Sequence, residues 1–380
     1  MTCLLHGIGT ADSGNPLSQA DALGLALGIN DRTGDLAPWL QGIFDHAGID
    51  RRSICVGPEV LADLIHRTRT TDSVFLPKGP DDAVGPTTGE RMGAYWEIAA
   101  PMATRAAQIA LAESGVPAES LTHLITVTCT GFRAPGLDHA LIQNLTLSPE
   151  IERTQVGFMG CHGALNGLRV AKAFTEANPA ANVLVVAAEV CTVHYHYGDS
   201  AKHLVGNALF ADGAGAVVLR GRDSEREMEG NPNPSQDIRP IWRLAATGSC
   251  VIPNSAGAMT WEIGDHGFEM TLSTKIPGLI GQHLRPWLDR WLERAGLSVA
   301  EVSSWAIHPG GPKILTAVEE ILQLTREQTT VSWNVLKQHG NMSSATALYL
   351  FQRLRQQNAP MPMVSLGFGP GMAVEAVLWR

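Results

Sequence analysis

One order of predicted elements occurs twice along the chain, and this internal repeat is the strongest constraint on its fold. In the first half a predicted strand ends at Cys129, a helix begins at Cys161, and the strand-like runs NVLVV and GAGAVVLR follow. In the second half a strand ends at His308, a helix begins at Asn341, and PMVSL and GMAVEAVLWR follow. Cys129 and Cys161 lie 32 positions apart, and His308 and Asn341 lie 33 apart. The spacing predicts two similar halves.

Strand-like and helix-like segments alternate in both halves, which favours an α/β protein with a largely buried sheet. Apolar runs such as HLITVTCT and NVLVVAAEV alternate with helical patterns such as GALNGLRVAKAFTEA and PKILTAVEEILQL. The Pro- and Asn-rich residues 221–240 lack apolar periodicity and are typical of a linker. We therefore expect residues 1–225 to form the half with Cys161, and residues 235–380 to form the half with His308 and Asn341.

Composition limits the partners that fit this chain. Of its 380 residues, 44% are hydrophobic and 17% are charged, as in a compact folded protein. The formal net charge of -9 argues against non-specific binding of nucleic acid, which needs a basic surface. The start of the chain lacks the basic region of a signal peptide, and no apolar run reaches the roughly 18 residues of a membrane span. We expect a cytoplasmic protein with no membrane span, with six reduced cysteines and, because none forms a CxxC pair, no metal site.

Cys161 opens a predicted helix within the stretch GFMGCHGALNGLRVA. The first turn of a helix presents unpaired N–H groups and the positive end of the helix dipole, and both favour a thiolate. A nearby imidazole lowers a thiol pKa further, from about 8.5 into a range of roughly 4 to 7. If the repeat brings His308 and Asn341 to Cys161, we expect a thiolate nucleophile that faces two N–H donors.

Two donors aimed at one point form an oxyanion hole, and each contributes on the order of 3 kcal/mol in the transition state. Such a hole stabilises a thioester carbonyl under attack, and also the enolate that forms when a malonyl thioester loses carbon dioxide. Neither step needs a metal. Structural alternatives exist: Cys161 could be a core side chain, His308 could cap a turn, and Asn341 could be an N-cap. Their placement at equivalent points of a repeat favours the catalytic interpretation.

Two further motifs carry less weight. GFGPG, residues 367–371, resembles part of a dinucleotide fingerprint, but it leads into the strand-like MAVEAVLW instead of a helix. VHYHYG places His194 and His196 two positions apart, which could begin a metal site, but the stretch holds no acidic or cysteine ligand. Neither motif supports nucleotide or metal chemistry.

Six stretches together resemble the type III polyketide synthases, the chalcone synthase-like family, across nearly the full length of the chain. They are GFMGCHGALNGLRVA, ALFADGAGA, VIPNSAGAM, WAIHPGGPKIL, HGNMSSAT and SLGFGPGMAVEAVL. The related β-ketoacyl synthases share the Cys, His and Asn set but typically carry HQAN where this chain has HPGG. The GFGPG stretch also favours the polyketide branch.

The resemblance implies a thiolase-like five-layer αβαβα fold of two similar halves, and a homodimer. It implies that Cys161 takes an acyl group from a coenzyme A thioester, while His308 and Asn341 promote decarboxylation of malonyl-CoA. The enolate attacks the acyl-cysteine, extension repeats, and the product cyclises. Acyl-CoA and malonyl-CoA are then substrates, and no cofactor is bound permanently. Phe210 matches the family's gatekeeper between the coenzyme A tunnel and the cavity.

The pocket positions implied by the resemblance differ from those of the plant enzymes. Ala134 replaces a methionine that projects into the partner subunit's cavity, Met270 replaces a gating phenylalanine, and Trp261 replaces a glycine. Three cavity threonines are replaced, by Cys129, Cys191 and His194. The remaining substrate-site candidates are Val193, Ser343, Gly367, Phe368 and Gly369.

The small side chain of Ala134 would leave room at one wall of the substrate cavity, and the large side chain of Trp261 would fill space at another. A cavity of this shape suits a linear acyl chain. We therefore expect a starter of medium or long chain and an alkylpyrone or alkylresorcinol product. A methylated or aromatic starter, or malonyl-CoA itself, is the alternative.

The region that binds coenzyme A also differs from that of plant members, which hold the phosphates with basic residues of an early helix. Here that region carries Trp39, Gly42 and His46. The candidates for coenzyme contacts are Gly310, Lys313, Arg51 and Arg52. Lys313 could equally be a solvated lysine. Weak phosphate contacts are compatible with delivery of the starter by an acyl carrier protein.

Three other functions fit the same residues. A β-ketoacyl-carrier-protein synthase III-like enzyme would perform one condensation and release a β-ketoacyl thioester. A thioesterase would use Cys161 to hydrolyse acyl-CoA without consuming malonyl-CoA. A catalytically silent binding partner would share only the fold, but the presence of Cys161, His308 and Asn341 counts against it.

Overall fold

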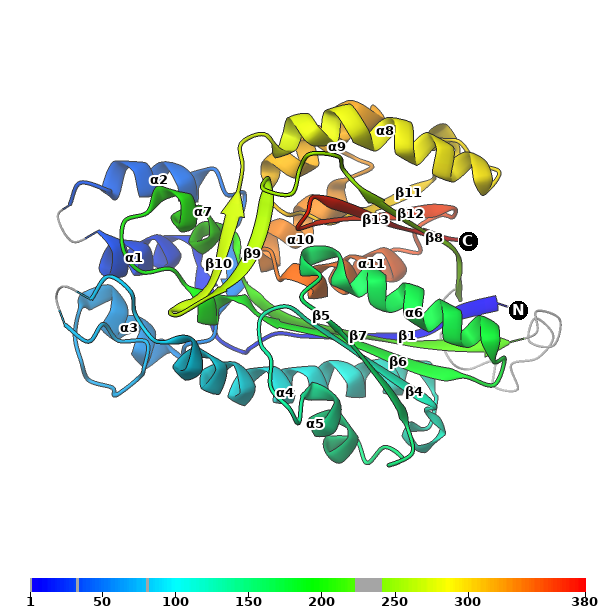
Figure 1. Cartoon of the computed structure of the whole chain (residues 1–380), viewed down its shortest axis with the longest axis horizontal. Coiled ribbons are helices and arrows are strands. Elements are labelled where there is room, and N and C mark those ends of the chain that lie inside the picture. Colours follow the sequence, from blue (N-terminus) through cyan, green and yellow to red (C-terminus); the bar gives the residue numbers. More distant parts are fainter. Residues whose placement is uncertain (1, 32–33, 80–81, 223–240) are drawn as a thin grey trace.

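The computed structural model describes residues 2–31, 34–79, 82–222 and 241–380. Most of the predicted linker, and the predicted boundaries at residues 225 and 235, lie outside the described residues. The described chain forms a mixed α/β fold around one large sheet (Figure 1). Within it, no helix is both long and apolar enough to cross a membrane.

The large sheet has nine strands, and the predicted internal repeat is visible in their order. Across the sheet they are β11 (Ser304–Ile307), β12 (Met363–Gly369), β13 (Ala373–Trp379), β8 (Trp242–Val251), β1 (Thr2–Ala11), β7 (Asp212–Arg222), β6 (Asn182–Val190), β4 (His123–Thr128) and β5 (Glu152–Gly157). Two small sheets pair β2 (Pro16–Ser18) with β3 (Arg51–Ser53), and β9 (Met259–Gly264) with β10 (Gly267–Leu272).

Strand directions repeat between the halves. In the N-terminal half β4 is parallel to β6, β6 is antiparallel to β7, and β7 is antiparallel to β1. In the C-terminal half β11 is parallel to β12, β12 is antiparallel to β13, and β13 is antiparallel to β8. A short antiparallel contact between β1 and β8, from Cys3 opposite Leu244 to Leu5 opposite Trp242, joins the halves. The four-strand pattern is therefore present twice, in the same order.

Helices form three layers around the strands. The longer ones are α1 (Gln19–Asn30), α2 (Ala37–Asp45), α3 (Pro58–His66), α4 (Thr88–Ser114), α5 (Leu137–Asn144), α6 (Gly163–Ala177), α7 (Ala201–Leu209), α8 (Ile276–Arg294), α9 (Pro312–Leu322), α10 (Thr330–His339) and α11 (Thr346–Gln356). Short 3-10 turns are η1 (Ala118–Ser120), η2 (Gly160–His162), η3 (Cys191–His194), η4 (Val299–Glu301) and η5 (Ser343–Ala345).

The central layer consists of α6 and α11. Helix α6 contacts β4 and β6 of its own half and β13 of the other, while α11 contacts β11 of its own half and β1 and β7 of the other. Helices α4 and α5 cover the outer face of the N-terminal strands, and α8 and α9 cover the C-terminal strands (Figure 1). The N-terminal and C-terminal strands of the sheet thus form two layers on opposite sides of α6 and α11 (Figure 1), which confirms the five-layer αβαβα arrangement expected from the family resemblance.

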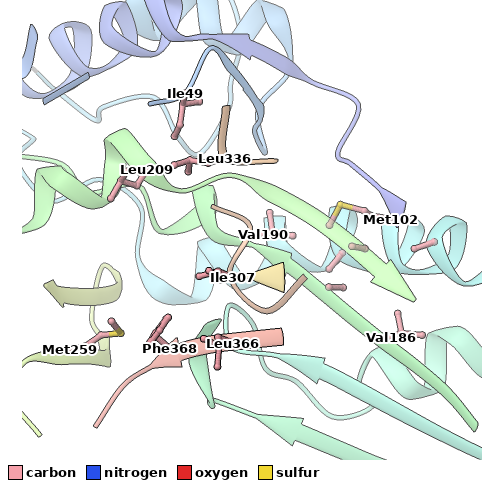
Figure 2. Close-up of a cluster of buried hydrophobic side chains, with 14 of the residues drawn as sticks. Ile49, Met102, Val186, Val190, Leu209, Met259, Ile307, Leu336, Leu366 and Phe368 are labelled. Carbon is pink, nitrogen blue, oxygen red and sulfur yellow. The ribbon is translucent and has the colours of Figure 1, made fainter. Parts of the chain in front are cut away.

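Buried apolar side chains hold the segments that carry the candidate catalytic residues. One cluster surrounds α6 and α11 and includes Leu168 and Phe351. A second cluster, shown in part in Figure 2, includes Leu209 and Ile307. Burial of such a side chain contributes roughly 1.5–3 kcal/mol. Because Leu209 precedes Phe210 and Ile307 precedes His308, this packing also fixes the site.

Candidate active site

A cavity of about 670 Å³, which we call the tunnel, ends where the two halves meet. Its walls come from α2, α7, β9, β10 and the first turns of α8 and α9. Trp39 and Lys313 lie exposed on its outer part, and Cys161, His308 and Asn341 line its buried part. The volume is within the range of small-molecule sites, about 300–1,000 Å³. The three predicted catalytic residues therefore share one cavity.

Cys161 lies in a tight turn between β5 and α6. The preceding Gly160 has a φ of +74°, and a Cβ at that position would lie 2.4 Å from Pro370 Cδ, so glycine is required. The turn places Cys161 at the N-terminal end of α6 with 7% of its surface exposed. Its Sγ lies 4.0 Å from Asn341 Oδ1. The helix starts of the two halves thus meet at this thiol.

The pKa of Cys161 differs from the sequence-based expectation. Burial raises the pKa of the thiol to about 11, the Glu189 carboxylate adds to the rise, and hydrogen bonds with Ser343 and Asn341 oppose it. Burial therefore opposes the thiolate that the helix N-terminus favours, because the buried thiol loses water. A base that takes the thiol proton would therefore assist Cys161 as a nucleophile.

His308 directly follows β11 and is 2% exposed. Its backbone N–H donates to Leu366 O at 2.8 Å, which ties the end of β11 to β12. Burial lowers the pKa of His308 to about 3, with a further contribution from His162. Among the described residues, neither ring nitrogen has a hydrogen-bond partner. The imidazole is therefore neutral and can accept a proton from one group and later donate it to another.

Asn341 lies between α10 and η5, and its side chain is held on both sides. Its Oδ1 accepts a hydrogen bond from Ser343 N at 2.9 Å, and its Nδ2 donates to Gly310 O at 3.3 Å. An amide nitrogen carries two hydrogens, so the contact with Gly310 leaves one for a substrate oxygen. With His308 in the same wall, this arrangement can stabilise an oxyanion.

Glu189, at the end of β6, is a buried residue of the site that the sequence reasoning missed. Its carboxylate accepts hydrogen bonds from Cys129 N at 3.0 Å and Thr130 Oγ1 at 2.6 Å, and also from Ser344 Oγ. Burial raises its pKa, and these hydrogen bonds oppose the rise. The signal in the sequence was a single acidic residue inside the otherwise apolar strand NVLVVAAEV.

Phe210 lies between the tunnel and two much smaller spaces, which we call the inner cavities. It lines the tunnel and both inner cavities, whose volumes are about 20 and about 40 Å³. A single water needs roughly 10–15 Å³ by this measure. In this conformation, space for an acyl chain therefore lies on the tunnel side of Phe210.

Trp261 and His194 fill the region behind Phe210. Trp261 Nε1 donates to Cys129 O at 2.7 Å, and the indole lies edge-on to His194 at 5.5 Å between ring centres. His194 Nε2 contacts Thr130 O at 2.7 Å, and its Nδ1 accepts from Phe268 N at 3.0 Å. Both ring nitrogens of His194 are therefore occupied, and Trp261 is anchored to the other half.

Most of the other substrate-site candidates also lie around Phe210. The inner cavities are lined by Cys129, Cys191, Met270 and Ser343, and the tunnel by Met270 and Phe368. Gly367 and Gly369 pack against His162, since a Cβ on Gly369 would lie 2.4 Å from His162 Cδ2.

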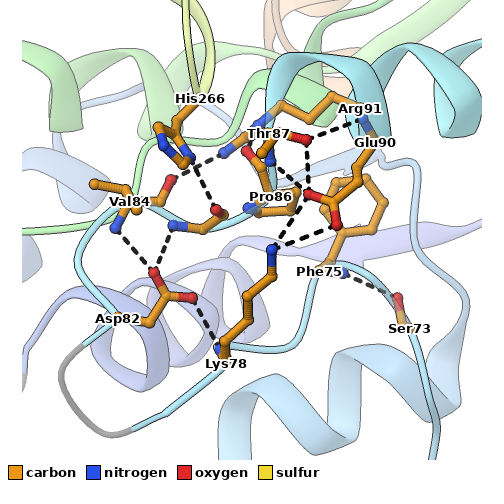
Figure 3. A network of polar contacts seen from close by, with 11 residues as sticks. Ser73, Phe75, Lys78, Asp82, Val84, Pro86, Thr87, Glu90, Arg91 and His266 are labelled. Atoms are coloured by element: carbon orange, nitrogen blue, oxygen red, sulfur yellow. Dashed lines mark hydrogen bonds and ion pairs between the residues drawn. The ribbon is translucent and has the colours of Figure 1, made fainter.

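Two substrate-site candidates lie elsewhere. Val193 is fully buried in the larger hydrophobic cluster, where its carbonyl accepts from Arg91 Nη1 at 2.5 Å. Arg91 Nε also donates to Pro86 O, and Figure 3 shows this arginine beside Pro86 and His266. Ala134 is exposed on the loop after β4. Arg91 therefore anchors the η3 turn, which carries Cys191 and His194.

The four candidates for coenzyme contacts separate into two groups. Gly310 and Lys313 line the tunnel, as do Trp39, Gly42 and His46. Arg51 is exposed on β3 and Arg52 is 3% exposed. The structure places Arg52 behind Phe210, where its Nη1 donates to Phe210 O, because side chains alternate between the two faces of a strand.

Comparison with known proteins agrees with this geometry. The models of the chalcone and stilbene synthases match residues 78–223 (N-terminal domain) and 243–380 (C-terminal domain). The "alpha-pyrone synthesis polyketide synthase-like Pks18" of Mycobacterium tuberculosis is 33% identical over 77% of this chain and 73% of its own length. The 3,5-dihydroxyphenylacetyl-CoA synthase of Streptomyces toyocaensis is 30% identical over 98% of this chain and 88% of its own.

A solved structure extends the similarity to the whole fold. PKS-I from the brown alga Ectocarpus siliculosus superimposes with a TM-score of 0.88 at 27% identity, covering 100% of this chain and 98% of that one. The chain is therefore a member of the chalcone and stilbene synthase family, the type III polyketide synthases, which are condensing acyltransferases.

Proposed function

We propose that Cys161 accepts an acyl starter, that His308 and Asn341 decarboxylate malonyl-CoA, and that the chain is extended in repeated condensations and then cyclised. The observation that carries this proposal is the shared tunnel, whose buried end is lined by Cys161, His308, Asn341 and Phe210. The proposed substrates are coenzyme A thioesters, with no permanently bound cofactor.

Loading begins from a neutral pair. Because the pKa of Cys161 is raised to about 11 and that of His308 is lowered to about 3, neither group is charged at neutral pH. His308 takes the thiol proton as Sγ bonds to the thioester carbon. The carbon–sulfur bond to coenzyme A then breaks, and the leaving thiolate takes the proton from the imidazolium.

Extension uses the N–H donors of the C-terminal half. When malonyl-CoA loses carbon dioxide, the electron pair of the broken carbon–carbon bond forms an enolate, whose oxygen accepts from the His308 ring and Asn341 Nδ2. The enolate carbon attacks the acyl carbonyl, the bond to Cys161 breaks, and the thiolate is released. Such donors are worth about 3 kcal/mol each in the transition state.

The starter we propose is an acyl chain of medium or long length, giving an alkylpyrone or alkylresorcinol. Apolar tunnel residues support this: the walls include Ile43, Leu272, Ile276 and Phe368. Each buried methylene contributes about 0.8 kcal/mol, a roughly fourfold gain in affinity. The mycobacterial relative, whose name assigns it to alpha-pyrone synthesis, is consistent with this product class.

The assembly and delivery of substrates are also proposals. We infer a homodimer, as the family resemblance implies, and a cytoplasmic location, as the sequence analysis indicates. The cations Arg51 and Arg52 lie off the tunnel wall and only Lys313 of the four coenzyme candidates offers a charge to it, which supports delivery of some starters by an acyl carrier protein. A comparison of acyl-CoA with acyl-carrier protein as donor would decide the source.

The direct test is incubation with malonyl-CoA and acyl-CoA starters from acetyl to stearoyl, with product analysis by mass spectrometry. We expect cyclic polyketides whose yield is largest at one chain length, and none from the Cys161→Ala variant. Release of a β-ketoacyl thioester would favour a single-condensation synthase. Coenzyme A release without carbon–carbon bond formation would favour a thioesterase, and an inert protein would favour a binding partner.

A further inference from the structure

A buried arginine lies behind the segment that joins α7 to β7. Arg52 is 3% exposed, and its Nη1 donates to Phe210 O at 2.9 Å and to Asn207 O at 3.0 Å. Its Nη2 donates to Gln19 Oε1 at 3.3 Å. Arg52 Nη1 carries two hydrogens and holds both carbonyls at once, which an apolar side chain cannot do. Arg52 therefore fixes the backbone of the gate residue.

The same segment is paired with the backbone of Asn341. Asn341 N donates to Leu209 O at 2.9 Å, and Ala211 N donates to Asn341 O at 2.9 Å, which makes a parallel bridge between Phe210 and Asn341. Both backbone polar groups of Asn341 are therefore held by the residues on either side of Phe210. A shift of this segment would move the catalytic amide.

Arg52 also packs against the residue before Asn341. Gly340 has a φ of +70°, and a Cβ there would lie 3.3 Å from Arg52 Cβ and 3.0 Å from Ala211 Cβ. The backbone at Gly340, which leads into Asn341, is therefore confined between Arg52 and residues 209–211, which we call the gate segment.

The nearest acidic group that acts on Arg52 is Asp212, the second residue after the gate, although burial raises the pKa of Asp212 to about 7. The Asp212 carboxylate accepts from Thr192 N at 2.9 Å and from Thr192 Oγ1 at 2.6 Å. Burial of a cation is costly unless polar partners offset the cost, so we expect this arginine to serve a purpose beyond filling space. The contacts of Arg52 with the gate segment indicate that purpose.

We propose that Arg52 is a positioning residue of the condensing site: it holds residues 209–211, and through their bridge it sets the place of both Asn341 and Phe210. This inference rests on the proposed function, because it assigns Arg52 to the decarboxylation step of that reaction. It also replaces the sequence-based expectation that Arg52 contacts coenzyme A.

The test compares two partial reactions in the Arg52→Met variant. Conversion of malonyl-CoA to acetyl-CoA reports the step that needs Asn341, and the mass of the acylated protein reports loading of Cys161. A catalytic group displaced by about 1 Å loses roughly 100-fold in rate, so we expect decarboxylation kcat to fall about 10- to 100-fold. Loading and the KM for malonyl-CoA should change by less than about threefold, because Arg52 contacts the tunnel-lining Phe210 only at its backbone carbonyl and, among the described hydrogen bonds, makes none with the Cys161 turn.

Two further variants separate positioning from stability. Arg355→Met removes another buried arginine, one that donates to His6 O at 3.1 Å on β1. It should lower the melting temperature without changing the ratio of decarboxylation to loading. Arg52→Met combined with Asp212→Asn removes both buried charges, so it should recover stability but not decarboxylation. Arg52→Lys should recover part of the rate.

The outcomes are distinct. If folded Arg52→Met decarboxylates malonyl-CoA like the wild type, or if both partial reactions fall equally in the double variant, the inference is wrong. A raised KM for coenzyme A thioesters with unchanged kcat would overturn it in favour of a coenzyme contact. If the wild type itself forms no carbon–carbon bond, the proposed function fails instead.

Discussion

The two halves of the molecule have the same arrangement of strands and helices, but they supply different chemical groups to the site. After the first strand of the repeated four-strand pattern, β4 in one half and β11 in the other, the N-terminal half places Cys129 and the C-terminal half places His308. At the start of the central helix, they place Cys161 and Asn341. The N-terminal half therefore offers thiols, and the C-terminal half offers nitrogen groups. The shared arrangement of strands and helices determines where these four side chains meet. Because the thiols come from one half and the nitrogen groups from the other, each half serves a different step of the reaction.

Replacement of Cys161 by alanine removes the contribution of the N-terminal half and has the largest expected effect. Without the thiol, no acyl-enzyme forms, so both acyl loading and product formation should be lost completely. Intact-protein mass spectrometry after incubation with acyl-CoA measures loading. An acyl adduct of undiminished yield on this variant would show that another residue is the nucleophile.

Asn341→Ala and His308→Gln weaken the contribution of the C-terminal half. Removal of one oxyanion donor typically costs about 100- to 1,000-fold in kcat, and we expect this loss in malonyl-CoA decarboxylation. Loading should fall less in Asn341→Ala, because the thiol and its base are intact. The measurement is acetyl-CoA production followed by chromatography. Full decarboxylation by His308→Gln would contradict the role given to His308.

The pH dependence of thiol alkylation sharpens the comparison between the halves. It tests whether Cys161 of one half and His308 of the other form a thiolate–imidazolium ion pair. The pKa of Cys161 is raised to about 11, so the thiol is protonated below that value and its thiolate fraction rises with pH. We expect the iodoacetamide reaction rate to rise about tenfold per pH unit from pH 6 to 9. Cys161→Ala supplies the background rate. A rate already on a plateau at pH 6 would indicate a thiolate–imidazolium pair.

Trp261→Ala tests a contact between the halves and has the smallest expected effect on rate. The indole belongs to the C-terminal half but donates to Cys129 O of the other half. Its loss should enlarge the inner cavities and shift the preferred chain length or extension number, with a change of only a few-fold in loading. Because Trp261 is partly exposed, we expect its loss to lower the free energy of unfolding by about 3 kcal/mol or less. Trp261→Phe is the conservative control, and identical product profiles would show that this wall does not select products.

The sequence predicted the repeat and the residues that meet, because strand ends and helix starts at equal spacing must converge when two similar halves pack together. It did not predict the pKa of Cys161, since a pattern at a helix start says nothing about the water that folding removes. Glu189 was missed because its partners come from two segments far from it in the sequence, Cys129 with Thr130 and Ser344. Long-range convergence of this kind has no local signature.

Arg52 illustrates a second limit. Two adjacent arginines in a short strand look equivalent in sequence, and both suit a phosphate. Alternation along β3 exposes Arg51 and buries Arg52, and the carbonyls that Arg52 binds belong to residues more than 150 positions away. The tertiary structure therefore decides which arginine is available to a ligand.

Malonyl-CoA decarboxylation by the Cys161→Ala variant tests the central claim, the division of labour between the halves, most directly. Because His308 and Asn341 remain in place, the account predicts that this variant still converts malonyl-CoA to acetyl-CoA, at a rate within about tenfold of the wild type, while forming no polyketide. A loss of decarboxylation as large as that in Asn341→Ala, in a folded protein, would contradict the account and show that the thiol is needed for both steps.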